Sequence, residues 1–133
     1  MKNGLIRESL RIAREKLPLH PQFSHWPHYT FMIQNNAIVD WGYNTNQEPS
    51  VHLGYNAQLE GGMSKTHAEL NAFRRAKGML NLNKPFECIN IRLNRQGAIR
   101  SAQPCKCCFT FLKTVGCSQC WFSTDVGFAK IGM

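Results

Sequence analysis

Apolar side chains recur at helical spacing near the beginning of the chain. They predict an amphipathic helix over residues 3–17, whose apolar stripe packs against the rest of the protein. Pro18 ends this helix, because proline cannot continue the helical hydrogen-bond ladder. The stripe consists of Ile6, Leu10, Ala13 and Leu17.

Shorter apolar and β-branched stretches predict strands. The first two strands meet at Asn35-Asn36, and asparagine tolerates the positive φ that a tight hairpin turn requires. Residues 94–103 are expected to form a polar turn region. The expected strands cover residues 29–34, 37–44, 86–93 and 117–124, and a short edge strand or a tail covers residues 128–131.

Two more helices are expected in the second half of the chain, over residues 67–78 and 104–115. Thr66 and Glu69 have the spacing of a capping box at the start of the first helix. Pro104 suits the first position of the second helix, because its fixed φ is helical, and Gly116 is expected to end that helix. Since helices alternate with strands here, we expect a sheet covered by helices, with at least one parallel pair of strands.

Composition limits the class of protein. The 133 residues suit one domain that folds without disulfides. No run approaches the ~18 apolar residues of a membrane span, and the charged stretch from Met1 to Lys16 is no signal peptide. We therefore expect a cytoplasmic protein with no membrane partner. The net charge of +8 favours a polyanionic or phosphate-bearing partner if the basic side chains cluster, and only solvated helix faces if they do not.

Two loops are candidates for ligand contact. Leu19 to His28 is rich in aromatic and histidine side chains, including Trp26, and forms either a ligand platform or a cover over the edge of the core. Residues 45–65 are polar, and a loop of that length is usually functional or mobile.

The candidate chemistry lies in two short segments, Thr66-His67-Ala68-Glu69 and Pro104-Cys105-Lys106-Cys107-Cys108, each at an expected helix start. Without a secretory signal, clustered cysteines favour metal binding or catalysis over disulfides. Cys105 and Cys108 are three residues apart and share a helical face. With His67 they supply the three protein ligands of a catalytic zinc site, whose open position is where zinc makes water a better nucleophile.

Glu69 follows His67 by two residues, so on an ideal helix their side chains point about 200° apart. They serve one site only if His67 sits at the irregular first turn and Glu69 reaches past it. A carboxylate within hydrogen-bond reach of the attacking water can then move protons.

The two segments together resemble the motif of the cytidine and deoxycytidylate deaminase superfamily, a family of zinc-dependent enzymes. Residues 67–72 (HAELNA) are similar to the helix start of deoxycytidylate and tRNA deaminases. Gly42-Tyr43-Asn44 resembles the strand end where the family's asparagine binds the sugar. The expected elements from residue 3 to about 124 follow the family's order, so the resemblance covers most of the chain.

The resemblance implies a three-layer α/β/α sandwich with a mixed central sheet, formed by residues 1–133. It implies that His67, Cys105 and Cys108 bind Zn²⁺, and that Glu69 is the general acid and base. The reaction would convert a cytosine base to uracil with release of ammonia. A free cytidine or deoxycytidine nucleoside or nucleotide is the expected substrate, because Ser101-Ala102-Gln103 replaces the tryptophan-containing segment of single-strand DNA mutators.

The resemblance also implies substrate contacts. Asn44 would hydrogen-bond the ribose or deoxyribose, although it is equally typical of a turn. The backbone N–H of Ala68 would face the base, and Thr124 and Asp125 lie in the loop that often sets base context in polynucleotide deaminases. Because the chain ends near Met133, the family's fifth strand is expected to be short or absent and its closing helix missing, so a neighbour in a homo-oligomer would complete the substrate wall.

Two alternatives remain. Cys105 and Cys108 followed by Cys117 and Cys120 could bind a structural zinc in a zinc-knuckle module for nucleic acid. Against this, the spacer is shorter than the ~15–20 residues typical of such modules, and a regular strand places Cys117 and Cys120 on opposite faces. The other alternative is a cytosine or adenine deaminase of single-stranded DNA or tRNA, favoured by the net charge of +8 and the aromatic loop. Cys107 is an alternative metal ligand.

Overall fold

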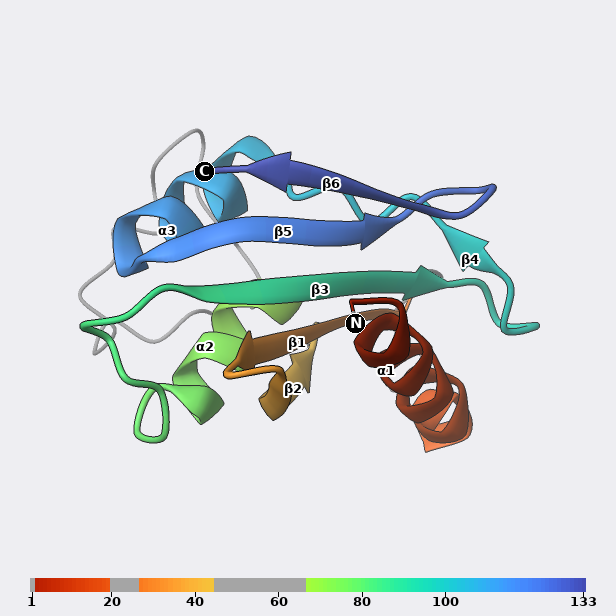
Figure 1. Ribbon diagram of the computed structural model, residues 1–133. Coiled ribbons are helices and arrows are strands. Elements are labelled where there is room, and N and C mark those ends of the chain that lie inside the picture. Colours follow the sequence, from red (N-terminus) through yellow and green to blue (C-terminus); the bar gives the residue numbers. More distant parts are fainter. Residues whose placement is uncertain (1, 20–26, 45–66) are drawn as a thin grey trace.

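The computed structural model describes residues 2–19, 27–44 and 67–133 (Figure 1). One six-stranded sheet has the order β2-β1-β3-β5-β6, and the short β4 pairs with β3. The strands are β1 (His28–Gln34), β2 (Ala37–Tyr43), β3 (Phe86–Leu93), β4 (Ile99–Arg100), β5 (Cys117–Ser123) and β6 (Phe128–Gly132). The helices are α1 (Lys2–Lys16), α2 (Ala68–Ala76) and α3 (Lys106–Val115), and a 3₁₀ turn, η1 (Leu17–Leu19), follows α1.

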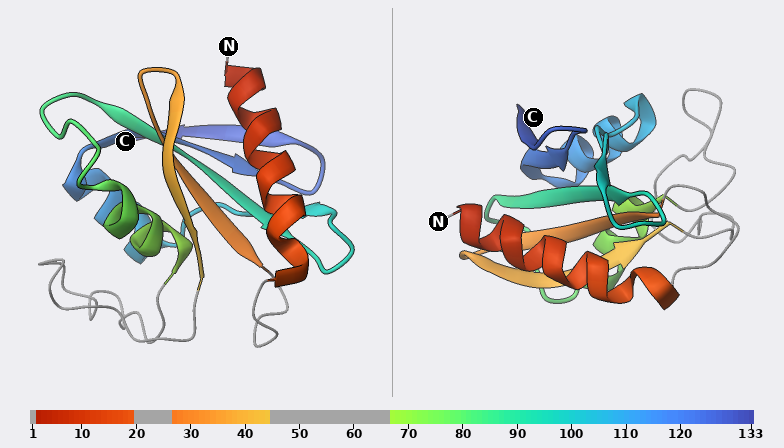
Figure 2. Two further views of the ribbon diagram at one scale, coloured as in Figure 1. Left: turned by 90° about the horizontal axis from the view of Figure 1, so that it is seen from below. Right: turned by 90° about the vertical axis from the view of Figure 1, so that its right-hand side faces the viewer.

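The sheet separates two helical layers. Figure 2 shows α1 on one side of the sheet and α2 and α3 on the other. Strands β3 and β5 are parallel, whereas every other pair is antiparallel. The expected three-layer α/β/α sandwich with a mixed sheet is therefore confirmed.

Strand alternation divides the core in two. On β3, Ile89 and Ile91 pack in the cluster that includes Ala13 of α1, while Cys88 packs in the cluster that includes Leu70 of α2 and Phe111 of α3. This is the period-two pattern of a strand buried on both faces. The residues of β3 that follow Cys88 on the side of the sheet covered by α2 and α3 consequently point toward the starts of these two helices.

Glycine and asparagine occupy the positions where the backbone needs them. Asn35 and Asn36 have φ of 54° and 58°, which confirms the expected hairpin turn. Gly116 ends α3 with φ of 103°, also as expected. A Cβ at Gly42 would lie 2.7 Å from the backbone nitrogen of Ala72, so glycine at this position lets α2 pack directly on β2.

Three local predictions are wrong. Pro104 precedes the N-cap of α3, which is Cys105, whose sulfur accepts a hydrogen bond from the backbone N–H of Cys108. The N-cap of α2 is His67, which makes no side-chain capping bond, and Glu69 is turned into the interior; Thr66 of the expected capping box lies outside the described residues. The region after β3, expected to be a turn, contains the strand β4. This strand has two residues and is too short to be predicted from hydrophobic periodicity.

Two further predictions concern β6 and the loops. The C-terminal segment is an edge strand antiparallel to β5, rather than a tail. Most of the aromatic loop, including Trp26, and the long polar loop lie outside the described residues. Among the helices in the described ranges, none is long and apolar enough to cross a membrane.

Candidate active site

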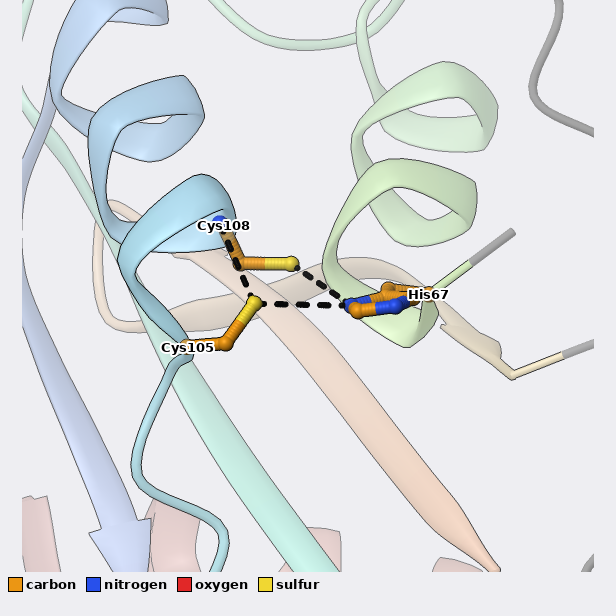
Figure 3. A group of neighbouring side chains, drawn as sticks. All are labelled: His67, Cys105 and Cys108. Carbon is orange, nitrogen blue, oxygen red and sulfur yellow. Dashed lines mark hydrogen bonds between the residues drawn. The ribbon is translucent and has the colours of Figure 1, made fainter. Parts of the chain in front are cut away.

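Three candidate metal ligands converge between the starts of α2 and α3 (Figure 3). His67 is the N-cap of α2 and has an extended backbone (φ −75°, ψ 158°), while Cys105 is the N-cap of α3 and Cys108 lies in its first turn. The Nδ1 of His67 lies 3.1 Å from the Sγ of Cys108 and 3.7 Å from the Sγ of Cys105. Within residues 2–19, 27–44 and 67–133, no other group of three His, Cys, Asp or Glu side chains is close enough to share an ion.

The spacing of this group fits a tetrahedral zinc ion. Bonds of roughly 2.0–2.1 Å to nitrogen and 2.3 Å to sulfur separate the ligand atoms by about 3.5–3.8 Å. The three ligand atoms all lie within 4.8 Å of one another. Cys108 is buried, His67 is half-buried and Cys105 is exposed, so solvent reaches one side of the group. Three protein ligands with an accessible side are typical of a catalytic site rather than a closed structural one.

The protonation of the group also favours a cation. Hydrogen bonds from the Cys108 thiol and from His67 lower the pKa of Cys105 to about 3. The pKa of Cys108 is raised, first because its thiol donates to Cys105 and then because it is buried. The hydrogen bond with Cys105 raises the pKa of His67. The Nδ1 of His67 thus lies within hydrogen-bonding distance of both sulfurs, and a metal ion takes the place of protons when it binds thiolates and neutral imidazole.

Glu69 is buried beside this group, with 1% of its surface exposed. Its carboxylate contributes to the raised pKa of Cys108 and to that of His67, so it lies near both ligands. The Oε2 accepts a 2.9 Å hydrogen bond from Nδ2 of Asn90, and the Oε1 has no hydrogen-bond partner among the described residues. His67 and Glu69 reach one site because His67 precedes the helix with an extended backbone, so the 200° separation of an ideal helix does not apply.

A buried histidine lies beside Glu69, and an arginine lies beside that histidine. The Nε2 of His28, at the start of β1, lies 3.9 Å from the Oε2 of Glu69. Burial lowers the pKa of His28 to about 4, so it is neutral near pH 7. Arg92, the register partner of His28 on β3, lowers the pKa of His28 further. Sequence patterns missed this pair, because His28 ends a loop and the contact depends on which strand pairs with β1.

Asn44 closes the open end of the β1–β2 hairpin. Its Oδ1 accepts a 3.1 Å hydrogen bond from the backbone N–H of His28, and its own N–H donates to the His28 carbonyl oxygen at 3.1 Å. These bonds tie the residue after β2 to the start of β1, next to His28, whose Nε2 lies 3.9 Å from the Oε2 of Glu69.

The other expected substrate residues are spread over two elements. Ala68 is the first residue of α2, where helix N–H groups have no acceptor within the helix. Thr124 and Asp125 lie in the β5–β6 turn, where the N–H and Oγ1 of Thr124 donate to the Gly127 carbonyl oxygen at 2.7 and 3.2 Å. Asp125 is exposed.

The other cysteines lie in the apolar core. Cys88, Cys107, Cys117 and Cys120 all belong to the cluster beneath α2 and α3. Cys117 and Cys120 would face opposite sides of a regular strand, but the β3–β5 register shifts by one residue between them, and both pack in this cluster. Both contact Cys88, whose pKa they raise. Among the described residues, Cys105 and Cys108 share a possible ion site with His67 and not with Cys117 and Cys120, which contradicts a four-cysteine site and, with it, the zinc-knuckle hypothesis.

Fold and site together define a class of protein: a helix-covered mixed sheet in which two helix starts present one histidine and two cysteines beside a buried glutamate. No family model matches the sequence, and no curated protein matches it either. Solved structures do match the fold.

A cytidine deaminase structure from Mycobacterium leprae matches with a TM-score of 0.58 and 15% identity, over 93% of this chain and 91% of that chain. The apo dCMP deaminase from cyanophage S-TIM5 matches with a TM-score of 0.57 and 17% identity, over 92% and 84% of the two chains. A cytidine deaminase from Mycobacterium tuberculosis matches with a TM-score of 0.57 and 14% identity, over 93% and 88%. The chain therefore has the fold of the cytidine deaminases.

Proposed function

We propose that this protein is a hydrolytic deaminase that converts a cytosine base to uracil and releases ammonia. His67, Cys105 and Cys108 hold one Zn²⁺, and Glu69 is the general acid and base. The observation that carries the proposal is the juxtaposition of three candidate metal ligands with a buried carboxylate, one of whose oxygens has no hydrogen-bond partner among the described residues. A carboxylate is costly to bury without a partner, so function accounts for its position better than stability does.

When bound, Zn²⁺ supplies Lewis-acid activation of a water molecule. The Oε1 of Glu69 accepts a proton from the water molecule while the oxygen of the water forms a bond to C4 of the base. The same carboxyl group then delivers this proton to the adjacent ring nitrogen. Glu69 next takes the remaining proton from the new hydroxyl group on C4 and passes it to the amino group. The C4–N bond then breaks, ammonia leaves, and the oxygen on C4 becomes the carbonyl oxygen of uracil. The low exposure of Glu69 keeps bulk water from competing for these protons.

A free nucleoside or nucleotide is the proposed substrate, since the structural neighbours are cytidine and dCMP deaminases. On this proposal Asn44 contacts the sugar through the part of its side chain that does not bond His28, and the N–H of Ala68 faces the base. Roles for Thr124 and Asp125, a cytoplasmic location, a single catalytic domain and assembly into a homo-oligomer stay predictions.

Deamination within single-stranded DNA or tRNA is the second candidate. The net charge of +8 favours it, because basic side chains neutralise phosphates. On α2, Arg74 and Arg75 are exposed, and the Arg75 guanidinium lies 5.8 Å from the ring centre of Trp41. An aromatic ring with a neighbouring cation is a pairing that single-strand binders use.

One assay separates these candidates. Purified zinc-loaded protein is incubated with cytidine, deoxycytidine, their monophosphates, single-stranded DNA and tRNA, and each product is identified by mass. We expect deamination of at least one free cytosine compound, and loss of at least about 100-fold in rate for Glu69→Gln with zinc retained. Glu15→Gln, on the exposed face of α1, is the matched control. Wild-type activity in Glu69→Gln would refute the role of this carboxylate.

A further inference from the structure

We propose that Asn90 is a positioning residue for the reaction, which holds one oxygen of Glu69 so that the other faces the attacking water. This inference rests on the proposed function. The sequence shows Asn90 only as a polar residue in an apolar strand, and in the structure it is completely buried.

Asn90 is the centre of a buried hydrogen-bond chain that joins three elements. From β1, the Oγ1 of Thr30 donates to Oδ1 of Asn90 at 2.7 Å. The Nδ2 of Asn90 donates to Oε2 of Glu69 at 2.9 Å and to the Ala102 carbonyl oxygen at 3.3 Å. Thr30 and Asn90 are 0% exposed and Glu69 is 1% exposed, so bulk water does not compete for these bonds.

The chain of bonds determines how the Asn90 amide is oriented. The Ala102 carbonyl oxygen can only accept a hydrogen bond, so the amide nitrogen of Asn90 must lie on that side. The same nitrogen faces Glu69, and Oδ1 is left to accept from Thr30. Asn90 therefore donates to the Glu69 carboxylate, and a flipped amide would place two oxygen acceptors against each other.

As a consequence, the two oxygens of the Glu69 carboxylate have different surroundings. The Oε2 is anchored by Asn90, whereas the Nε2 of His28 is 3.9 Å away and too far for a hydrogen bond. The Oε1 has no partner among the described residues and is the oxygen available to the water. Since Glu69 has several rotamers, loss of the anchor lets the carboxylate leave the productive position, which lowers the rate without changing how substrate binds.

Hydrogen-bonding partners in the outer shell of metal sites typically change affinity or activity by about 10–100-fold. We therefore expect Asn90→Leu, which has similar volume and no donor, to lower kcat about 10–100-fold. We expect KM to stay within about twofold and zinc content to stay at one ion per chain, because Asn90 bonds Thr30, Glu69 and Ala102 and none of the three candidate metal ligands. A purely structural role would lower melting temperature and leave the kcat of the folded fraction unchanged.

A milder pair of variants keeps the test decisive if Asn90→Leu does not fold. Thr30→Val removes the hydroxyl that orients the Asn90 amide while keeping the shape of the side chain, and Thr30→Ser keeps the hydroxyl. We expect a lower kcat for Thr30→Val and near wild-type kcat for Thr30→Ser. Equal kcat for these two variants, both folded and zinc-loaded, would overturn the inference.

A zinc-loaded crystal structure of Asn90→Leu, or of Thr30→Val if the first variant does not fold, tests the inference without turnover. Displacement of the Glu69 carboxylate with the ligands in place supports it, and an unmoved carboxylate overturns it. This result stands even if the wild-type protein deaminates no cytosine compound, an outcome that would refute only the proposed function.

Discussion

The protein contains two groups of cysteines that differ in almost every physical respect. Cys105 and Cys108 lie at a helix start beside His67, with one sulfur exposed and the pKa of Cys105 lowered to about 3. Cys88, Cys117 and Cys120 lie in the apolar core, and the pKa of Cys88 is raised well above its ordinary value. Their difference teaches that the place of a cysteine in the fold, rather than the number of cysteines, decides whether it can bind a metal.

The largest effect is expected from removal of one sulfur of the site. Cys108→Ala should abolish stoichiometric zinc binding and lower the deamination rate at least about 1000-fold, because the metal loses one of three ligands. Metal analysis and an ammonia assay measure the two effects. Cys107→Ala is the matched control, since Cys107 directly precedes Cys108 in the sequence and is buried in the core. Zinc loss from the control instead would make Cys107 the ligand.

The two groups should also differ in reactivity once the metal is removed by a chelator. Iodoacetamide should modify Cys105 at least about tenfold faster than Cys88, because the thiolate is the reactive form and Cys88 is buried and protonated. Peptide mass spectrometry locates the labelled sulfurs over time. Added zinc should protect Cys105 and leave the slow labelling of Cys88 unchanged; labelling of Cys88 first would show that the core opens more easily than the site.

Acid should destabilise the site through His28. Its pKa is about 4 in the folded protein, against an ordinary value of 6.5, so the unfolded chain binds an extra proton between these values. This contribution to stability is present above pH 6.5 and is lost as the pH falls toward 4, at a total cost of about 3 kcal/mol. Urea unfolding of wild type and His28→Gln across this range measures it. Both proteins release metal in acid, so the difference between their unfolding free energies isolates the contribution of His28. If the unfolding free energies of the two proteins fall in parallel with pH, the lowered pKa of His28 is contradicted.

The smallest effect is expected in the core. Cys117→Ala should cost about 1 kcal/mol of unfolding free energy, a typical value for a single substitution. Zinc content and the rate of deamination should stay at wild-type levels, because Cys117 lies in the apolar cluster rather than in the metal group. Denaturant unfolding and metal analysis on the same samples provide the test, and a loss of zinc would revive the four-cysteine alternative.

Periodicity and spacing predicted most of the fold and the set of three candidate metal ligands that it brings together. The strand Phe86–Leu93 and the helix end at Gly116 agree with the prediction, because each depends on local preference. The convergence of His67 with Cys105 and Cys108 agrees with the expected ligand set, because the motif combines both helix starts.

Features that depend on tertiary register were not predictable in this way. The pairing of His28 with Arg92 requires knowing that β1 lies beside β3. The contact of Asn90 with Glu69 requires knowing which face of β3 meets α2. The bulge that turns Cys117 and Cys120 to one face of β5 interrupts the alternation of side chains along the strand, and no local sequence pattern predicts it.

Zinc K-edge X-ray absorption of the metal-loaded protein tests the central claim most directly. The account predicts two sulfur ligands at about 2.3 Å and two nitrogen or oxygen ligands at about 2.0–2.1 Å, the second of these being a solvent molecule in the open position. Four sulfur ligands, or a protein that retains no zinc after loading and desalting, would contradict it.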